Sequence, residues 1–330
     1  MGNTTLKDIA KIVGTSISTV SRALNYKDGV SPELAEKIFK VAQQMNYPFE
    51  NYNKKTSSTH TIGVIVPDIS NPFFPKVIYG MESVLKANGY TVIVLNIDEN
   101  PKTERKCLES FLSNKVSGVL SASTCNVDPK YYRNLLKENI PVVFYDRVFE
   151  EVKALSVSID NKMAIFNAVN HLYSHGHRRI AFVSGIHTIY TGKEREEGFK
   201  SAIKTLGLDQ DNCPIIPGEF RIAETAIQVK DYIKKINVTA IVTSNNMTTI
   251  GVLKALKTLN LKFPEDVSLI GFDLEDWSDI LDLTVVVQPK YSIGVISATM
   301  LLKQMSAKKF SSESVVLMPE LIVKNSVKQL

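Results

Sequence analysis

Cysteine is scarce in this sequence, with only Cys107, Cys125 and Cys213 among 330 residues. An odd number without C-x-x-C spacing excludes a disulfide framework and a cysteine-rich zinc site, and favours free thiols in a reducing compartment. Long apolar runs are also missing, since none approaches the roughly 20 residues that span a bilayer. The first residues, MGNTTLKDIAKIV, lack the order of a secretory signal. We therefore expect a protein of the cytoplasm with no membrane partner.

Sequence motifs of the common enzyme classes are missing as well. The chain contains no GxGxxG, GxxxxGK[ST], GxSxG or HExxH. His171, His175 and His177 lie close together, but no Cys, Asp or Glu accompanies them at ligand spacing, so we assign them to helix capping and packing. These observations predict no metal, no cofactor, no catalytic residue and no enzymatic activity. If the chain did act on sugars, Asp146 or Asp273 would be the nucleophile or base.

Length and composition fit several soluble domains. Apolar residues make up 44% and charged residues 22% of the chain, which is ordinary for a globular protein. The net charge is +5. Within residues 1–60, eight Lys or Arg face five acids, which gives +3, so over half of the excess lies in a fifth of the chain. This asymmetry is compatible with a nucleic-acid-binding head.

The first 45 residues predict three short helices around one small core. Apolar residues recur on one helical face from Leu6 to Val13, with Thr5 as N-cap and Gly14 as the stop. A second helix begins after Ser16, and a third after Ser31, each Ser being the N-cap. Two helices joined by a tight glycine turn form the helix-turn-helix pattern, in which the second helix reads the major groove of DNA.

The DNA-reading residues follow from this placement. The outward and N-terminal residues of the second helix are the candidates: Ile17, Ser18, Thr19, Ser21 and Arg22. An arginine can donate two hydrogen bonds to guanine, a serine can pair with several bases, and an isoleucine can contact a thymine methyl.

The head then shows a specific resemblance. The stretch DIAKIVGTSISTVSRALN, followed by VSPELAEKI and MNYP, resembles the DNA-binding head of the LacI/GalR family of bacterial transcription regulators. The resemblance implies a dimer that binds a palindromic operator through the helix that begins at Ser16. It also implies DNA contacts from flanking residues, namely Thr5, Ser16, Asn25 and Tyr47.

The remaining chain alternates buried-strand runs with amphipathic helical stretches, which is typical of parallel sheets. The alternation occurs twice, so we expect two doubly wound parallel-sheet lobes. The expected strands are IGVIV, TVIVL, VSGVLS and PVVFY in the first series, and IAFVS, PII, AIVTS and VSLIGF in the second. The expected helices cover 73–89, 101–114, 129–139, 192–206, 222–235 and a stretch from 247.

The body is similar to that of the same family. PDISNPFF, YDR, SIDN, GHRRIAFVSG, REEGF, GFD and LTVVVQP occur in the family's order. The resemblance implies a body of periplasmic-binding-protein type, whose chain crosses between lobes near SIDN, VVVQP and PELIV. The expected domains are a helix-turn-helix head (1–48), a linker (49–61) and an effector-binding and dimerisation body (62–330). The first lobe takes about 62–159 and 289–318, and the second about 160–288 and 319–330.

Ligands of such sheets settle at the carboxyl ends of the strands. The residues that match the family there, together with the only tryptophan, predict a clamp for a sugar or sugar acid: Asn71, Phe73, Asp146, Arg147, Arg195, Asn245, Asp273, Trp277 and Gln288. Carboxylates, amides and guanidinium groups suit neighbouring hydroxyls, and Phe73 and Trp277 offer apolar platforms. Arg147 and Arg195 together favour a carboxylate or phosphate on the ligand. Asp160 is expected to cap a helix.

The segment between head and body departs from the family. Its NYPFENYNKKTSSTHT lacks the ARxL element that, in the family, forms a short helix whose leucine opens the minor groove. Phe49 or Tyr52 would replace that leucine, with Lys54 and Lys55 on phosphates, or the segment is disordered until DNA binds. A repressor tuned by an effector is the main hypothesis. A transport binding protein, a sugar-acting enzyme and regulation by a protein corepressor are the alternatives.

Overall fold

The computed structural model describes residues 4–24, 29–45, 47, 59–233, 237–273, 275–307 and 311–330. The chain divides into two compact units, the head (residues 1–59) and the body (residues 60–330). Each is described by itself. Most of the expected linker lies outside the described residues, and so do Asn25, Lys54 and Lys55.

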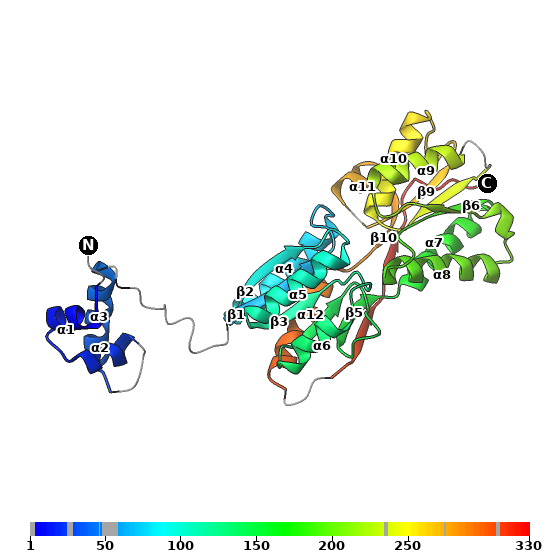
Figure 1. Cartoon of the computed structure of the whole chain (residues 1–330). Coiled ribbons are helices and arrows are strands. Elements are labelled where there is room, and N and C mark those ends of the chain that lie inside the picture. Colours follow the sequence, from blue (N-terminus) through cyan, green and yellow to red (C-terminus); the bar gives the residue numbers. More distant parts are fainter. Residues whose placement is uncertain are drawn as a thin grey trace. The chain divides into compact units, whose positions relative to one another are not determined.

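The head contains the three helices that the sequence predicts (Figure 1): α1 (Leu6–Val13), α2 (Ile17–Leu24) and α3 (Pro32–Gln44). Their shared core is built from the apolar faces of all three helices, and its buried members are Ile9, Ala10, Val13, Val20, Ala23, Leu24, Ile38 and Ala42. Gly14 ends α1 with a φ of 76°, a left-handed conformation that glycine adopts without steric cost. Its N–H donates to the Ala10 carbonyl at 3.0 Å.

Thr5 lies at the N-cap position of α1 as expected but makes no side-chain cap, whereas Ser16 and Ser31 cap the starts of α2 and α3 with their hydroxyls. The Asp8 carboxylate accepts from the backbone N–H and the hydroxyl of Thr5, at 2.9 and 2.6 Å. The Ser16 hydroxyl accepts from the Thr19 N–H at 3.0 Å, and the Ser31 hydroxyl accepts from the Leu34 N–H at 3.3 Å. Caps of this kind each contribute about 1 kcal/mol to helix stability.

The body holds two six-stranded sheets, one in each lobe. In lobe 1 the strand order is β11-β5-β4-β3-β1-β2, and in lobe 2 it is β12-β10-β9-β8-β6-β7. The strands of lobe 1 are β1 (Thr59–Val66), β2 (Thr91–Asn96), β3 (Val116–Ser121), β4 (Val142–Tyr145), β5 (Leu155–Ile159) and β11 (Ser314–Leu317). Those of lobe 2 are β6 (Ile180–Ser184), β7 (Ile215–Pro217), β8 (Ala240–Thr243), β9 (Ser268–Phe272), β10 (Thr284–Val287) and β12 (Glu320–Ile322).

One edge strand departs from the expected parallel pattern. β12 pairs with β10 antiparallel, whereas the other pairings whose direction is given are parallel. The reason is the crossing at residues 318–319. β11 leaves the sheet of lobe 1 at the carboxyl ends of its strands. The chain then enters the sheet of lobe 2 at the carboxyl ends of its strands, so β12 runs against them.

Helices cover both faces of each sheet, as in other doubly wound folds. Lobe 1 carries α4 (Phe73–Ala87), α5 (Pro101–Ser113), α6 (Lys130–Lys137) and α12 (Lys290–Met305). Lobe 2 carries α7 (Asn161–Ser174), α8 (Tyr190–Thr205), α9 (Ile222–Ile233), α10 (Asn246–Thr258) and α11 (Asp276–Ile280). In Figure 1, α12, which is late in the sequence, lies among the early elements of lobe 1. The chain thus crosses between lobes at 159–161, 288–290 and 318–319.

A close glycine contact fixes α12 against α4. A Cβ added to Gly294 would lie 2.0 Å from the Val77 carbonyl oxygen, and one added to Gly80 would lie 2.4 Å from the Tyr291 carbonyl oxygen. Both distances are far below van der Waals contact, so the two backbones approach each other as closely as only glycine allows. This contact joins a C-terminal helix to the first helix of the body.

Asp160 and His177, two polar residues outside the cleft, have structural roles. The Asp160 carboxylate accepts from the Met163 N–H at 2.9 Å and caps α7, as predicted. His177 is fully buried, and its ring nitrogens lie 2.9 Å from the Thr239 hydroxyl and 3.2 Å from the Lys328 carbonyl.

In the described part of the chain, no helix combines the length and the apolar character that crossing a membrane requires.

Candidate functional site

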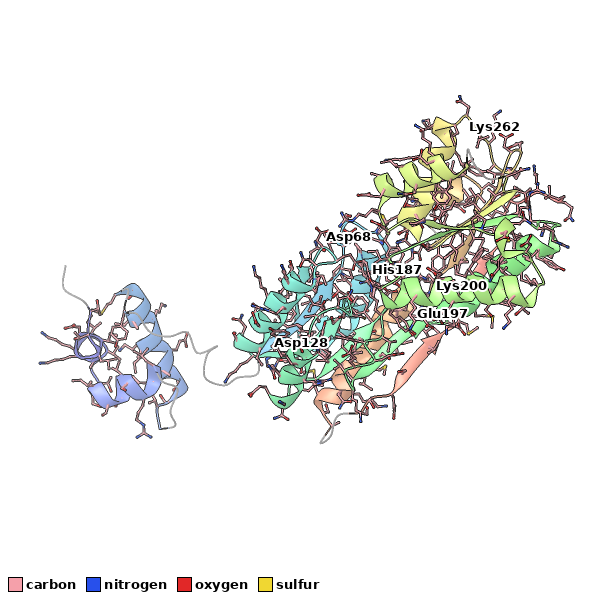
Figure 2. All side chains as sticks on the ribbon, turned by 45° about the vertical axis from the view of Figure 1, so that its right-hand side comes forward. Asp68, Asp128, His187, Glu197, Lys200 and Lys262 are labelled. Atoms are coloured by element: carbon pink, nitrogen blue, oxygen red, sulfur yellow. The ribbon has the colours of Figure 1, made fainter. Side chains whose placement is uncertain are left out.

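A cleft with a cavity volume of about 270 Å³ lies between the two lobes of the body, at the carboxyl ends of strands from both sheets. It brings together eight of the nine effector-binding residues predicted from the sequence: Asn71, Phe73, Asp146, Arg147, Arg195, Asn245, Asp273 and Gln288. Sequence reasoning missed the other residues that line it: Asp68, Ser70, Phe74, Asp98, Glu99, Thr191, Glu219, Phe220, Arg221, Ile222, Glu224 and Met247. Figure 2 shows Asp68 at the end of lobe 1 that faces lobe 2.

Trp277 is the residue that the cleft leaves out. It is half-buried in α11 and packs against the core cluster of lobe 2, and it is not among the lining residues. α11 begins at Asp276, after the strand end that carries Asp273, and this helix takes the indole back onto the sheet. The aromatic side chains that line the cavity are Phe73 and Phe74 from lobe 1 and Phe220 from lobe 2.

Two aspartates occupy equivalent places in the two lobes. Asp146 follows β4 and Asp273 follows β9, and both have a left-handed backbone, with φ values of 63° and 71°. Each N–H donates to the adjacent strand, Asp146 to the Val157 carbonyl at 2.9 Å and Asp273 to the Val286 carbonyl at 2.7 Å. The left-handed conformation is unfavourable for residues with a side chain, and these backbone hydrogen bonds hold it in place. Such conformations are found most often at functional sites.

Burial changes the acidity of Asp146. Its removal from water raises the pKa to about 6, which the positive charges of Arg147 and Arg195 oppose and the negative charges of Asp273 and Glu99 reinforce. The carboxylate forms one ion pair, with the Arg147 Nε at 3.7 Å. On the opposite lobe, Asp273 accepts from the Gln288 amide at 2.9 Å and lies 3.6 Å from the Lys290 ammonium.

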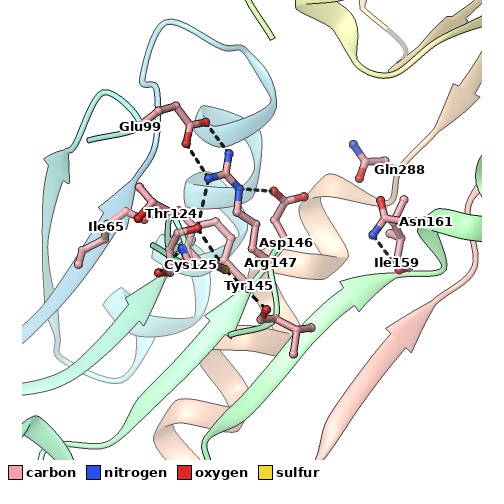
Figure 3. A network of polar contacts seen from close by, with 12 residues as sticks. Ile65, Glu99, Thr124, Cys125, Tyr145, Asp146, Arg147, Ile159, Asn161 and Gln288 are labelled. Atoms are coloured by element: carbon pink, nitrogen blue, oxygen red, sulfur yellow. Dashed lines mark hydrogen bonds and ion pairs between the residues drawn. The ribbon is translucent and has the colours of Figure 1, made fainter. Parts of the chain in front are cut away.

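Arg147 is engaged by protein groups. Its two terminal nitrogens donate to the two carboxylate oxygens of Glu99, at 2.7 and 2.6 Å, and Nη1 also donates to the Ser123 carbonyl at 3.2 Å. Figure 3 shows the guanidinium group between the carboxylates of Glu99 and Asp146. The two-point pairing with Glu99 is the geometry in which a guanidinium group binds a carboxylate most strongly.

Arg195 ties three parts of the cleft together. Its Nε donates to the Asn161 side chain at 2.7 Å, Nη1 to the Ser244 carbonyl at 2.6 Å, and Nη2 to the Gln288 side chain at 3.3 Å. The guanidinium carbon lies 4.1 Å from the centre of the Phe272 ring. Asn161 and Gln288 lie at the first and second crossings between the lobes. Arg195 is therefore bonded to both crossings as well as lining the cavity.

Several polar contacts bridge the lobes around the cavity, in addition to the contact of Lys290 with Asp273. The Asn246 amide donates to the Asn71 side-chain oxygen at 2.9 Å, the Lys76 ammonium lies 3.2 Å from the Glu275 carboxylate, and Arg221 lies 3.7 Å from Asp98. Asn245, next to Asn246, caps α10 by accepting from the Thr248 N–H at 2.8 Å. The cleft is thus both a cavity and the seam along which the lobes meet.

The residues of the head lie on the faces that the helix-turn-helix pattern predicts. Ile17, Ser18 and Arg22 are exposed on α2, while Thr19 and Ser21 are half-buried. Thr5 is exposed at the start of α1. Tyr47 is half-buried and packs against the core of the head.

The comparisons with known proteins agree with both units. The family model for bacterial regulatory proteins of the lacI family matches residues 5–48, and the model for periplasmic binding proteins and the sugar-binding domain of the LacI family matches residues 59–324. The chain belongs to the LacI family. It is a DNA-binding transcription regulator of that family, and its body has the family's sugar-binding fold.

Individual relatives align over nearly the whole chain. The chain is 32% identical to the ribose operon repressor of Halalkalibacterium halodurans, with 98% of this chain and 97% of the relative covered. It is 31% identical to the transcriptional repressor CytR of Escherichia coli, with 99% and 97% covered. Among solved structures, a LacI family regulator from Enterococcus faecium with bound ribose is similar, with a TM-score of 0.75 and 27% identity, covering 82% of this chain and 99% of that chain.

Some residues in and around the cleft were not predicted from the sequence, because they lie in a turn or at a crossing between the lobes. Glu99 and Asp98 lie in a turn after β2, where φ values of 52° and 48° direct their side chains in a way that no strand or helix pattern predicts. Asn161 does not line the cavity but accepts from Arg195, and the sequence motif SIDN predicted only a crossing there. A signal was present for Asn161, because a polar side chain at a crossing between two lobes lies next to the cleft. For Glu99 the sequence carried none.

Proposed function

We propose that this regulator is a homodimeric repressor of the cytoplasm, whose affinity for a palindromic operator changes when a neutral monosaccharide binds in the cleft. Of the two ligand classes expected from the sequence, the sugar fits the cleft better than the sugar acid. The main supporting observation is that carboxylates from both lobes face the cavity while Arg147 beside Asp146 is already paired with Glu99.

The donors and acceptors support this ligand class. When ionised, the carboxylates of Asp146 and Asp273 can only accept hydrogen bonds. Because they come from opposite lobes, the ligand must offer hydrogen-bond donors on two sides, and the hydroxyls of a sugar ring supply them. Arg195 uses three of its five N–H groups on the protein, and this leaves N–H groups for hydroxyl or ring oxygens. Phe73, Phe74 and Phe220 supply apolar surface for the carbon face of the ring. A cavity of about 270 Å³ suits a molecule of monosaccharide size.

The relatives suggest which sugar to test first. The 32% identical relative is a ribose operon repressor, and a 27% identical solved structure contains bound ribose. D-ribose is therefore our first candidate, and other neutral pentoses and hexoses are the comparison set.

Coupling between cleft and head needs little free energy. A ligand changes operator affinity only if it binds one arrangement of the lobes better than another. A ten- to hundredfold change in operator affinity corresponds to about 1.4–2.8 kcal/mol.

The test has two parts. Calorimetric titration of the full chain with D-ribose and the comparison sugars should identify a ligand that binds in the micromolar to millimolar range. Fluorescence anisotropy with a palindromic duplex, selected from a random pool, should then show a changed operator affinity when that ligand is added. Sedimentation of the protein on its duplex tests the dimer. The absence of any selected palindrome, or of binding by any neutral sugar, would refute the proposal.

A further inference from the structure

Glu99 and Arg147 form one wall of the cleft. The Arg147 side chain is 3% exposed and the Glu99 side chain 16% exposed, so their contact is largely shielded from water. Both carboxylate oxygens of Glu99 are used by the two terminal nitrogens of Arg147, at 2.6 and 2.7 Å. Figure 3 shows this two-point contact at the end of the guanidinium group that points away from Asp146.

The turn that carries Glu99 holds the carboxylate in place. Residues 98 and 99 both have left-handed backbones. The Glu99 N–H donates to the Pro67 carbonyl at 3.0 Å, and the Asn100 N–H donates to the Ile97 carbonyl at 3.0 Å. Asn100 then caps α5. Glu99 is thus fixed between a strand end and a helix start, and its approach to Arg147 is built into the backbone.

The pairing leaves little of Arg147 for an anion. Nη1 donates to Glu99 and to the Ser123 carbonyl, Nη2 donates to Glu99, and Nε lies 3.7 Å from the Asp146 carboxylate. A guanidinium group binds a carboxylate or phosphate most strongly through two parallel N–H donors. In Arg147, Glu99 occupies both terminal nitrogens, and Nε, which has no hydrogen-bond partner among the described residues, lies beside the Asp146 carboxylate.

The rest of the cleft adds to this effect. Its lining contains three arginines, Arg147, Arg195 and Arg221, against seven acids: Asp68, Asp98, Glu99, Asp146, Glu219, Glu224 and Asp273. Seven acids against three arginines give a formal charge of −4 when all are ionised. A negative field in a cleft lowers the local concentration of anions and disfavours their binding.

We propose that Glu99 is a specificity-determining residue, which makes the cleft select neutral sugars and reject their anionic derivatives by occupying Arg147. This inference rests on the proposed function, because it concerns the ligand of the same cleft. It differs from the expectation that two arginines indicate a carboxylate or phosphate on the ligand. In the sequence the arginines are visible, but the partner that occupies one of them is not.

The decisive variant is Glu99→Gln. The amide keeps the size of the side chain and one acceptor oxygen, but it removes the negative charge and leaves Arg147 with an unpaired N–H beside the cavity. The probes are D-ribose, D-ribose 5-phosphate and inorganic phosphate. In the wild type we expect D-ribose to bind at least tenfold more tightly than its phosphate. In Glu99→Gln we expect that ratio to fall by about tenfold or more, and inorganic phosphate to raise the melting temperature.

Two controls isolate the pair. Glu219→Gln removes one negative charge from an exposed lining residue that belongs to lobe 2, so it measures the effect of cleft charge alone, and we expect at most a twofold change in the ratio. The double variant Glu99→Gln with Arg147→Gln removes the cation as well. It should lose the phosphate response that Glu99→Gln gains.

Each outcome decides the matter. An unchanged ratio in Glu99→Gln, or an equal change in Glu219→Gln, overturns the inference. If D-ribose fails to bind the wild type, the choice of ribose falls, but the inorganic phosphate measurement still tests Glu99: stabilisation of Glu99→Gln and not of the wild type supports the inference, and stabilisation of neither overturns it. If Glu99→Gln does not fold, Glu99→Asp, which withdraws the carboxylate by one methylene, must show the same direction of change.

Discussion

Single residues of the cleft act through what surrounds them. Asp146 has a carboxyl group that looks ordinary in the sequence, yet burial raises its pKa to about 6. Arg195 looks like an anion receptor in the sequence, yet it is bonded to residues at two of the three chain crossings. The environment of these side chains, and not their type alone, sets their chemistry.

The pKa of Asp146 predicts a pH dependence of sugar binding. Hydroxyl donors need the ionised carboxylate, so affinity should fall as the pH drops through about 6, by about tenfold between pH 7 and pH 5. Folding stability changes in the opposite direction, because the folded carboxyl binds a proton more readily than the unfolded one: the contribution of this group falls as the pH rises from about 4 to about 6.

Calorimetric titration of a neutral sugar across this pH range measures the effect, because the ligand itself does not titrate. Asp146→Asn is the control and should bind weakly at all pH values, without the pH-dependent step. An affinity in the wild type that stays constant from pH 5 to pH 7 would contradict the assignment of Asp146 as an acceptor for the ligand.

Arg195 predicts a different result for a conservative change. Arg195→Lys keeps the charge but loses the fork that bonds Asn161, Ser244 and Gln288 at once. We expect the free energy of unfolding to fall by about 2 kcal/mol, because buried partners lose their donors, and sugar binding to weaken with it. Thermal and urea unfolding measure the first effect. Lys200→Ala on the exposed face of the same helix, where Lys200 pairs with Glu196, should change stability by less than about 1 kcal/mol.

At the scale of elements, the contact between α4 and α12 is the point where sequence-distant parts of lobe 1 depend on one another. Gly294→Ala would place a methyl group 2.0 Å from the Val77 carbonyl oxygen, and neither backbone can move without separating the helices. We expect a loss of stability of about 1–3 kcal/mol or more from this overpacking.

Thermal unfolding of Gly294→Ala measures that loss. Ser292→Ala, an exposed position two residues away on α12, is the matched control and should be neutral or slightly stabilising, because alanine has the higher helix propensity. Equal melting temperatures for Gly294→Ala and Ser292→Ala would show that α4 and α12 can move apart without a loss of stability.

The elements also show how far the sequence can be interpreted. Local patterns predicted the head, its glycine turn and its caps, because each depends on residues within one or two turns of helix. They predicted most strands, because a buried parallel strand is a continuous apolar run. They did not predict the antiparallel direction of β12, which depends on where the chain enters lobe 2, nor the packing of α12 on α4.

The cleft divides in the same way. Eight of its residues were expected because they match the family's motifs, most of them at strand ends and Arg195 within REEGF on α8. Asn71 and Asn245 were expected, but the bond from Asn246 to Asn71 across the seam was not, because it joins residues 175 positions apart. Trp277 was expected there and packs elsewhere. Sequence shows which side chains follow a strand, but the turn that follows decides where they point.

At the scale of the whole molecule, the division into a head of residues 1–59 and a body of residues 60–330 predicts separable functions. A fragment of residues 60–330 keeps every buried contact of the cleft, so it should fold and bind the same sugar with the affinity of the full chain, within about twofold. It should lose sequence-selective binding to the duplex, because α2 is missing.

Calorimetry and fluorescence anisotropy on the fragment and on the full chain measure both properties side by side. Sequence-selective duplex binding by the fragment would show that the helix-turn-helix is not the reading element. A loss of sugar binding in a folded fragment would show that the cleft depends on the head.

The three crossings have one more consequence, for the order in which the protein is made. Lobe 1 needs α12 and β11, which end at residue 317, so it is incomplete until nearly all of the chain has left the ribosome. Lobe 2 needs β12 and closes only a few residues later. A nascent chain of about 280 residues would therefore expose the unfinished edges of both sheets at once, and premature termination should yield an insoluble product in place of a working half.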